Sequence, residues 1–553
     1  MSSYSARDAH RRGSIVPPLA GVDRPALEIV PESCDVLICG TGLVESILAA
    51  ALAWQGTNVL HIDANPHYGD AWASLSLSDL RQYIENDSFL KNPQLYAPRE
   101  TAKLLVDLNP HLLFAKSDML DLLLKSRVFK YLEFKALGMF HTFQNDSFER
   151  VSGNKEAIFT DQSLSASVKR RLMKFIKWTL EWQLDATQIE ELRNTTASDF
   201  LRDRFQLEQQ QIDELVIAIG LCSTTQLSAF KALKQIRRYL LSLDIYGYFP
   251  VLYSTYGSGG ELSQAFCRSA AVAGATYKLN TTLVNFDSKS QIATLSDGSK
   301  IQVAEKVIIS PTQPSPLKEN PEEEAELEPE ASQTTVTSRL VAVVSNECKE
   351  WYGDKESAAV VVFPPGSLKD NKMAVQTIVF GPGAGSVPAG SSAWYLSTQE
   401  QDEQKARQDL ANALERLDAN ILRESTAEFD LGELSQGDVL FKPDGNPAIS
   451  SVRLGQSMQA FVPKRKLQYL VKFGYRHECS KKPSAGKAIN HHILVVPHTI
   501  AEVSYDGVIS IARKLYEQVV GSDDDFFDVD FEDEDEAPLD VAGLDEEVMH
   551  MEI

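Results

Sequence analysis

The feature that most constrains the fold is a short apolar run followed by a glycine turn near the start of the chain. Residues Cys34–Cys39 are mostly apolar, and Gly40-Thr41-Gly42 follows them directly. A run of this length that ends at glycine predicts a buried parallel strand. Residues 43–54 then predict a helix of small side chains, and residues 58–63 predict a second strand that ends in Asp63. The sequence therefore predicts a β–α–β unit of the dinucleotide-binding type.

The glycine turn departs from the dinucleotide fingerprint at one position. Gly40 and Gly42 stand at the first two glycines, and Asp63 has the spacing of the acidic residue that binds a ribose. Glu45 replaces the third glycine, and a carboxylate at a helix N-terminus would repel the pyrophosphate that normally lies there. We therefore interpret Gly40, Gly42, Glu45 and Asp63 as a vestigial dinucleotide motif and expect no cofactor.

The charge of the chain excludes nucleic acid as its main ligand. The net charge is −23, whereas phosphate backbones select surfaces rich in Lys and Arg. Fifteen of the carboxylates lie between Asp523 and Glu552, where no Lys or Arg occurs. Such a block repels itself and stays solvated, so the folded part of the chain is expected to be only mildly acidic.

A helical pattern interrupts the α/β pattern in the middle of the chain. Apolar residues recur at helical spacing between about Leu104 and Tyr239, where strand-like alternation is nearly absent. Strand patterns return after Tyr246. We expect an α/β large domain of the flavoprotein-like, FAD/NAD(P)-binding type, into which a smaller all-helical domain is inserted. The expected parts are a disordered arm (1–31), the discontinuous large domain (32–115 and 246–520) with an acidic loop (312–335), the helical domain (116–245) and a disordered acidic tail (521–553).

No pattern typical of a catalytic or metal site occurs in the sequence. The six cysteines are widely scattered without a Cys-x-x-Cys pair, so reduced and buried thiols are expected. His491, His492 and His498 lack a cysteine or carboxylate at metal-binding spacing. Neither a Gly-x-Ser-x-Gly elbow nor a P-loop is present. Without an apolar run of membrane-spanning length or a signal peptide, the sequence predicts a non-catalytic, metal-free cytosolic protein that meets membranes only transiently, through a partner.

Several stretches resemble the superfamily of Rab escort proteins and Rab GDP-dissociation inhibitors. Residues 40–46 and 59–63 are similar to its hallmark sequences, and Asn65-Pro66-His67-Tyr68-Gly69 resembles its Rab-binding segment. A further block, residues 256–268, continues into residues 274–279. Residues 72–76 are closer to the escort branch than to the inhibitor branch. Residues 121–126 with 130–135, and residues 157–159 followed by 169–175, also resemble the escort branch, and the chain is identified as of fungal type.

The resemblance implies a binding function. Proteins of the escort branch bind GDP-bound Rab GTPases, present them to the Rab geranylgeranyltransferase heterodimer, shelter the geranylgeranyl lipid and deliver the prenylated Rab to membranes. The family is flavin-free, and the prenyl transfer belongs to the partner enzyme. The Rab-binding positions carry over to Tyr68, Glu261, Arg268, Thr276 and Lys278. The transferase contact is expected on the helical domain, near Phe200 and Phe205.

Some positions depart from the family, and two alternatives stay open. Asp70 stands where a second glycine is usual, while Ser263 and Ala265 replace a Pro and a Gly. The first alternative is a Rab GDP-dissociation inhibitor proper, which extracts prenylated Rabs without supporting prenylation. The second is a flavin-dependent oxidoreductase on the same fold, which would require the third glycine of the turn.

Overall fold

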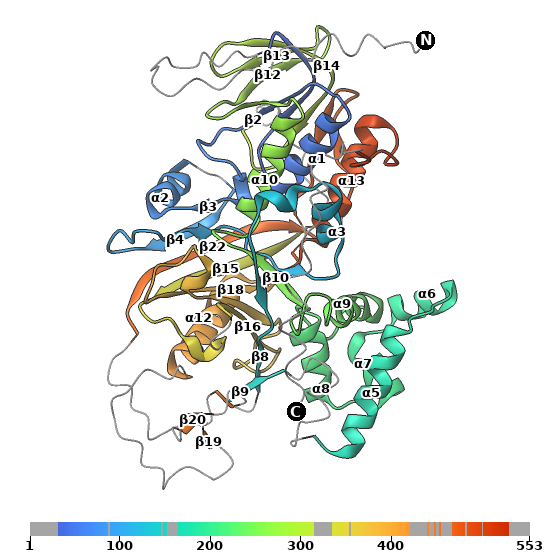
Figure 1. Cartoon of the computed structure of the whole chain (residues 1–553), viewed down its shortest axis with the longest axis vertical. Coiled ribbons are helices and arrows are strands. Elements are labelled where there is room, and N and C mark those ends of the chain that lie inside the picture. Colours follow the sequence, from blue (N-terminus) through green and yellow to red (C-terminus); the bar gives the residue numbers. More distant parts are fainter. Residues whose placement is uncertain are drawn as a thin grey trace, which may run out of the picture.

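Two β-sheets stacked along the long axis of the molecule, with a group of helices beside the second, make up the protein (Figure 1). The computed structural model describes residues 31–86, 89–144, 147–151, 164–314, 334–352, 356–420, 439–441, 447–449, 453–454, 467–481, 484–499 and 501–529. Of the predicted arm, only residue 31 is described. Residues 315–333 of the predicted acidic loop also lie outside the described residues.

The first sheet is built around the predicted β–α–β unit. Its order is β11-β2-β1-β14-β13-β12, and β24 also pairs with β14. The neighbours β11, β2, β1, β14 and β24 run parallel, as buried apolar strands next to crossover helices do. The strands are β1 (Ser33–Cys39), β2 (Val59–Ile62), β11 (Thr276–Lys278), β12 (Leu283–Asp287), β13 (Ile292–Leu295), β14 (Lys300–Ile309), β23 (Lys487–Ala488) and β24 (Ile493–Val495).

Helices from both ends of the chain cover one face of this sheet. Helix α1 (Leu43–Trp54) packs between α10 (Gly259–Val272) and α13 (Asp506–Val520), and α3 (Asp118–Lys125) packs on α13. Small side chains of α1, such as Ala49 and Ala50, are fully buried in this contact. The first sheet and its helices are therefore assembled from distant parts of the sequence.

The second sheet has nine strands in the order β21-β9-β8-β16-β17-β18-β15-β22-β4. Helix α12 (Glu403–Asn420) packs against it beside the buried Trp394. The strands are β4 (Lys91–Tyr96), β8 (Phe140–Gln144), β9 (Ser147–Arg150), β15 (Thr334–Val344), β16 (Ala358–Phe363), β17 (Val375–Phe380), β18 (Ser392–Thr398), β21 (Arg453–Leu454) and β22 (Tyr469–Ser480). Smaller sheets join β6 (Leu113–Phe114), β10 (Val251–Ser254) and β7 (Phe134–Leu137), then β3 (Ser74–Leu75) with β5 (Val106–Asp107), and β19 (Val439–Phe441) with β20 (Pro447–Ile449).

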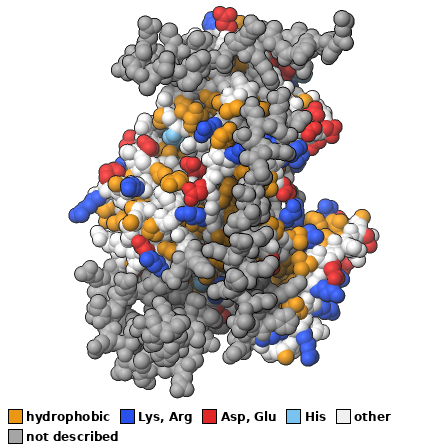
Figure 2. All heavy atoms as spheres, in the orientation of Figure 1, with side chains coloured by type: hydrophobic (Ala, Val, Ile, Leu, Met, Phe, Trp, Pro, Cys, Tyr) orange, Lys and Arg blue, Asp and Glu red, His pale blue; other side chains and the backbone are white. Residues whose placement is uncertain are grey.

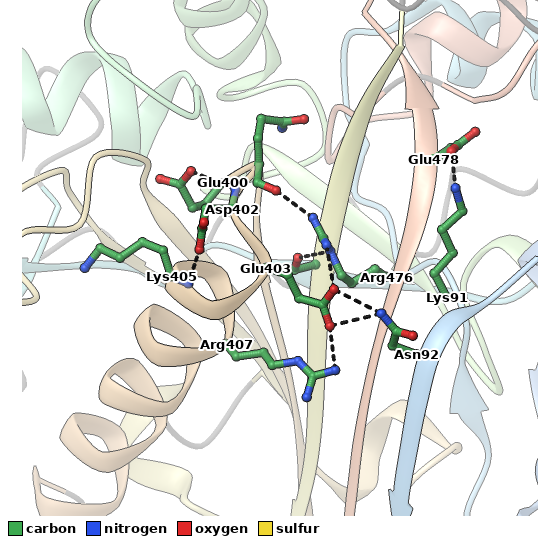
Figure 3. A network of polar contacts seen from close by, with 11 residues as sticks. Lys91, Asn92, Glu400, Asp402, Glu403, Lys405, Arg407, Arg476 and Glu478 are labelled. Atoms are coloured by element: carbon green, nitrogen blue, oxygen red, sulfur yellow. Dashed lines mark hydrogen bonds and ion pairs between the residues drawn. The ribbon is translucent and has the colours of Figure 1, made fainter.

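A polar network holds the edge of the second sheet to the start of α12 (Figure 3). Glu403 accepts hydrogen bonds from Arg476 of β22 at 3.1 Å and from Asn92 of the edge strand β4 at 3.0 Å. Arg407, one helical turn later, lies 2.7 Å from the same carboxylate. Charge-assisted contacts of this kind are stronger than neutral ones, so Glu403 ties three segments together.

The helical part consists of several helices within the stretch where the sequence shows helical spacing. They are α5 (Ala166–Leu180), α6 (Ala186–Asn194), α7 (Ala197–Phe205), α8 (Gln209–Asp213), a π-helix (Glu214–Ile219) and α9 (Ala229–Ser242). Ser165, Asp185 and Thr196 each accept a backbone hydrogen bond at a helix start, which satisfies N–H groups that have no partner within the helix. The remaining described helical segments are η2 (Asp70–Trp72), α2 (Leu77–Asn86), η3 (Val128–Tyr131), η6 (Lys349–Trp351) and η7 (Pro382–Ala384).

The expectation that residues 116–245 are all helical is wrong for residues 134–150. This stretch forms β7, β8 and β9, and β8 pairs in parallel with β16. The pairing joins Phe140 to Val360, which is distant in sequence. Such a partner leaves little local signal, because strand preference depends on sheet neighbours.

The expectation that the chain is free from residue 521 onward is also wrong for its first residues. Helix α13 ends at Gly521, whose φ of +92° suits glycine. The following segment then returns to the protein, and Phe526 and Phe527 are each only 1% exposed. These two rings join the core between the sheet and its covering helices. Residues 530–553 lie outside the described residues.

The cysteines carry the buried, reduced thiols that the sequence predicts. All six thiols are buried and none is in a disulfide. Within the described ranges, no group of three or more His, Cys, Asp or Glu side chains is arranged to hold a metal ion. None of the helices among the described residues is both long and apolar enough to cross a bilayer. Basic and acidic side chains are interspersed over the described part of the face in Figure 2.

Candidate functional site

The glycine turn after β1 is closed by the protein's own chain. Gly40 has a φ of +103°, and a Cβ there would lie 2.6 Å from Cβ of Ser310 and 2.9 Å from Cγ of Gln313. Only glycine allows the end of β14 to approach the turn so closely. Gln313 crosses the turn and donates to Asp63 at 3.1 Å. The segment after β14 therefore lies over the vestigial dinucleotide motif.

Asp63 is used for internal hydrogen bonds. Its Oδ2 accepts from the amide and the hydroxyl of Thr41, at 2.7 and 2.6 Å. Its Oδ1 accepts from the amide of Asn65 at 2.8 Å and from Gln313. A carboxylate has about four acceptor positions, so this buried group has no capacity left for a ribose hydroxyl.

Two further carboxyl groups are buried beside the turn. Glu45 is 4% exposed and Asp70 is 2% exposed. Burial raises the pKa of Glu45 to about 7, and burial together with the nearby charge of Asp63 raises the pKa of Asp70 well above its ordinary value. Asp70 accepts a hydrogen bond from Thr312 and has a φ of +46°, a left-handed conformation that Asp tolerates. This conformation explains how Asp70 fits where glycine is usual.

These groups do not fit a flavin dinucleotide. The cavity that Gly42, Glu45, Asp70 and Thr312 help to line has a volume of about 30 Å³, enough for about two water molecules. A pyrophosphate placed there would meet buried carboxyl groups in place of free N–H donors. The motif therefore serves the fold, and no chemistry is assigned to a bound cofactor.

The second part of the candidate site is helix α10 and the glycine-rich loop before it. Gly259 lies against Trp72, and a Cβ at Gly259 would clash with the indole ring. Glu261, in the first turn of α10, is half-buried; burial and then the charge of Asp107 raise its pKa. Arg268 is exposed two turns later on the same helix, with its guanidinium 4.7 Å from the ring centre of Tyr131. The two charged residues can therefore share one surface, because i and i+7 positions lie on one helix face.

The remaining predicted residues lie at the edge of the first sheet. Strand β11 pairs with β2, and the ring of Tyr68 meets that of Tyr277 edge-on at 5.8 Å. Thr276 and Lys278 point to the other face of β11, because neighbouring side chains alternate. Lys278 forms an ion pair with Asp297, and this hydrogen bond lowers the pKa of the Asp297 carboxyl. The Lys278 side chain is only 12% exposed, so it is committed mainly to that pair.

Asp107 is a positioning residue that the sequence did not reveal. It is buried, accepts from the Ser258 amide at 3.2 Å and from the Ser74 hydroxyl, and so fixes the loop that begins α10. Burial raises its pKa. An isolated acid between the apolar Val106 and Leu108 was the available signal, since a buried charge needs partners.

The two phenylalanines of the helical part have different surroundings. Phe205 is 4% exposed and its ring lies 5.2 Å from that of Phe175, so it belongs to the core. Phe200 is only partly buried, and its ring is 5.5 Å from that of Trp178. The guanidinium of Arg204 lies over both Trp178 and Phe200, at 4.8 and 5.6 Å from their ring centres. Of the predicted pair, Phe200 is the one that a partner could reach.

Comparison with known proteins gives consistent relatives. Residues 30–323 match the GDP dissociation inhibitor family. Rab proteins geranylgeranyltransferase component A of Saccharomyces cerevisiae is 45% identical over 94% of this chain and 90% of its own length. The protein of the same name from Candida albicans is 41% identical, over 91% of this chain and 87% of its own length. The Rab GDP-dissociation inhibitor of S. cerevisiae is 29% identical over 46% of this chain and 58% of its own length.

Solved structures confirm the predicted fold class. The Rab GDI of Plasmodium falciparum has a TM-score of 0.60 and 20% identity, and the match covers 89% of this chain and 99% of that one. An oxidoreductase from Methanosarcina mazei has a TM-score of 0.51 and 9% identity, with coverage of 87% and 99%. At such identities the likeness concerns the fold alone, since one fold hosts many functions.

Proposed function

Because this chain belongs to the GDP dissociation inhibitor family, we propose that it acts within that family as a Rab escort protein. It binds GDP-bound Rab GTPases, presents them to Rab geranylgeranyltransferase and carries the prenylated product. The observation that carries this proposal is the 45% identity, over 94% of the chain, to a protein named as component A of that transferase. In this role the chain is an accessory component that leaves the prenyl transfer to its partner.

The Rab-binding surface is proposed to comprise Tyr68, Glu261, Arg268, Thr276 and Lys278, which we call the platform. Its support is that the loop after β2 meets β11 through the rings of Tyr68 and Tyr277, and that α10 ends shortly before β11 begins in the chain. Arg268 beside Tyr131 offers an exposed cation and an aromatic ring, a combination that is enriched at the centres of protein interfaces. Asp107 holds the start of α10 in place, so Glu261 is presented on a fixed helix.

The helical part is proposed to serve the two other partners. Phe200, Trp178 and Arg204 form a partly exposed aromatic and cationic cluster, which we assign to the transferase. The geranylgeranyl chain of the Rab is proposed to lie between helices of the same part, whose cores are apolar. Such a carrier works in the cytosol and meets membranes transiently, while it delivers its lipidated cargo.

A binding experiment with purified components tests the proposal. Immobilised protein should retain unprenylated, GDP-bound Rab and the transferase heterodimer together, and prenylation of Rab in solution should depend on it. Retention of prenylated Rab without any binding of transferase would contradict the escort assignment and favour a GDP-dissociation inhibitor proper. A Rab loaded with a GTP analogue is the matched control, and it should bind more weakly.

A further inference from the structure

The segment that follows α13 is anchored by two buried phenylalanines. Phe526 lies against Tyr516 with ring centres 5.4 Å apart, and Phe527 lies 6.1 Å from Phe266 of α10. The guanidinium of Arg513 is 4.9 Å from the centre of the Phe526 ring. Each buried aromatic ring of this size contributes a large apolar area. We call Phe526 and Phe527 the diphenylalanine anchor.

Hydrogen bonds hold the backbone of the anchor between the ends of α1 and α3. Gln55, at the end of α1, donates to the carbonyls of Asp525 and Asp528, at 2.8 and 3.1 Å. Lys125, at the end of α3, donates to the carbonyl of Phe526 at 3.1 Å. Three residues span at most about 10 Å, so the chain at Val529 is still close to the end of α3.

The surface next to this point is basic and apolar. Leu124, Phe129 and Tyr131 are 46%, 38% and 39% exposed, although large apolar side chains are usually buried. Residues 124–132 hold three cations and no carboxylate in a chain of net charge −23, and Arg268 lies over Tyr131. Of the acids nearby, Asp121 is paired with Lys116 at 3.4 Å and Glu133 is exposed. We call residues 124–131 together with Arg268 the α3–η3 surface.

We propose that residues 530–553 bind the α3–η3 surface as an intramolecular ligand. This segment holds eleven carboxylates and no Lys or Arg, interspersed with apolar residues such as Phe531, Leu539 and Leu544. Its composition complements a surface of two lysines, two arginines and exposed apolar side chains. The anchor holds Val529, the last described residue before the segment, close to that surface. A ligand tethered at such a point has an effective concentration on the order of millimolar. Weak charge contacts that would fail between separate molecules are then sufficient.

The consequence is a link between the tail and the platform. Arg268 belongs both to the α3–η3 surface and to the platform, so the tail and a GTPase compete for one cation. The existence of the intramolecular contact does not depend on the proposed function, and the following experiment contains no GTPase. Its failure therefore leaves the escort proposal intact.

Lysine footprinting of the full-length protein tests the contact. Lys130 is exposed on η3, and Lys174, exposed on α5, is the internal control. In one variant the acidic run is neutralised by Glu532→Gln, Asp533→Asn, Glu534→Gln, Asp535→Asn and Glu536→Gln. Acetylation of Lys130 should become at least about threefold faster in this variant, while Lys174 should change little, because exposed ion pairs are worth less than about 1 kcal/mol. Salt at about 0.5 M should have the same effect on the wild type, since it screens exposed charges.

Zero-length carbodiimide cross-linking gives the second measurement. Wild-type protein should form bonds between carboxylates of residues 532–547 and Lys125 or Lys130, and Phe526→Ala with Phe527→Ala should reduce their yield. Equal cross-linking to Lys174 would show unspecific charge attraction and overturn the proposal. Equal acetylation of Lys130 in the wild type and the neutralised variant would also overturn it.

Discussion

Glu45 is a carboxyl group held out of water in the first turn of α1. Its pKa of about 7 in the folded chain, raised mainly by burial, stands above its ordinary value of 4.5. The folded state therefore binds a proton at Glu45 more tightly than the unfolded state does. The stability that this difference contributes is complete below about pH 4.5 and is lost as the pH rises through about 7.

The variant Glu45→Gln should flatten the dependence of stability on pH. A difference between 4.5 and about 7 corresponds to about 3 kcal/mol, and Asp70 will leave part of the dependence in place. Urea unfolding at about pH 5 and about pH 8 measures the free energies. Glu85→Gln changes an exposed carboxylate of α2 and is the control. An equal pH dependence in both variants would contradict a protonated Glu45.

Glu261→Ala combined with Arg268→Ala should abolish capture of GDP-bound Rab while the fold stays intact. Truncating a charge that becomes buried in an interface costs about 2–5 kcal/mol, so two such losses weaken binding about a thousandfold. Titration with Rab measures the affinity, and circular dichroism checks the fold. Gln264→Ala removes an exposed side chain of the same helix and should bind Rab normally. Wild-type affinity in the double variant would remove Glu261 and Arg268 from the platform.

The site residues that could be identified from the sequence belong to one motif of neighbouring positions. Gly40, Glu45 and Asp63 lie within one short motif, and the structure places all three at the turn. Gln313 and Asp107 could not be identified in this way. Gln313 contacts Asp63 across 250 positions and Asp107 contacts Ser258 across 151, and no spacing rule relates residues so far apart.

At the scale of elements, the diphenylalanine anchor divides the C-terminal segment into a part that should stabilise the fold and a part, residues 530–553, that should not. Phe526→Ala with Phe527→Ala should lower the free energy of unfolding by about 2–4 kcal/mol, less than two core substitutions, because the segment can detach locally. Removal of residues 530–553 alone should change it by about 0.5 kcal/mol or less. Urea unfolding of both proteins measures the contrast. Equal stability of the double variant and the wild type would show that the anchor does not hold in solution.

The two phenylalanines of α7 should separate stability from partner binding. Phe205→Ala should destabilise the protein by about 3 kcal/mol, as the loss of a buried ring does, whereas Phe200→Ala should cost less than about 1 kcal/mol. If the cluster around Phe200 binds the transferase, Phe200→Ala alone should weaken that binding in a folded protein. Thermal unfolding and a transferase pull-down measure the two effects. Unchanged retention of the transferase by Phe200→Ala would move the contact elsewhere.

Most elements were predictable because their hydrophobic period is local. The helix at residues 43–54 and the strands at 33–39 and 59–62 lie within about two residues of the predicted bounds. The strands at residues 134–150 were missed although β8 and β9 pair with each other. The other partners of this region are far away in sequence, since β7 pairs with β10 and β8 pairs with β16. The anchor was missed because two aromatic residues within an acidic run give no period at all.

At the scale of the molecule, the chain contributes to the first sheet again after it has formed the second sheet and the helical part. Strand β24 pairs with β14, and α13 packs on α1, so residues near both ends share one core. The sequence predicted this discontinuity from the interruption of one pattern by another. The register of the strands could not be predicted from the sequence, because long-range pairing is set by contacts across the fold. Closure of the glycine turn is a property of this assembled whole, since residues of β2, α1 and the segment after β14 all take part.

The assembled protein should therefore purify without flavin and take none up. Thr312 and Gln313 follow β14, which lies beside β1 in the sheet, and they hydrogen-bond to Asp70 and Asp63. A dinucleotide would have to displace both side chains and lie against buried Glu45, in a cavity of about 30 Å³. Uncovering several buried polar groups costs about 1–3 kcal/mol for each one left unpaired, and no free N–H cradle is gained. The absorption spectrum of the purified protein, before and after incubation with excess FAD and gel filtration, measures the outcome. Stoichiometric flavin in either sample would contradict both the closure of the turn and the reading of the motif as vestigial.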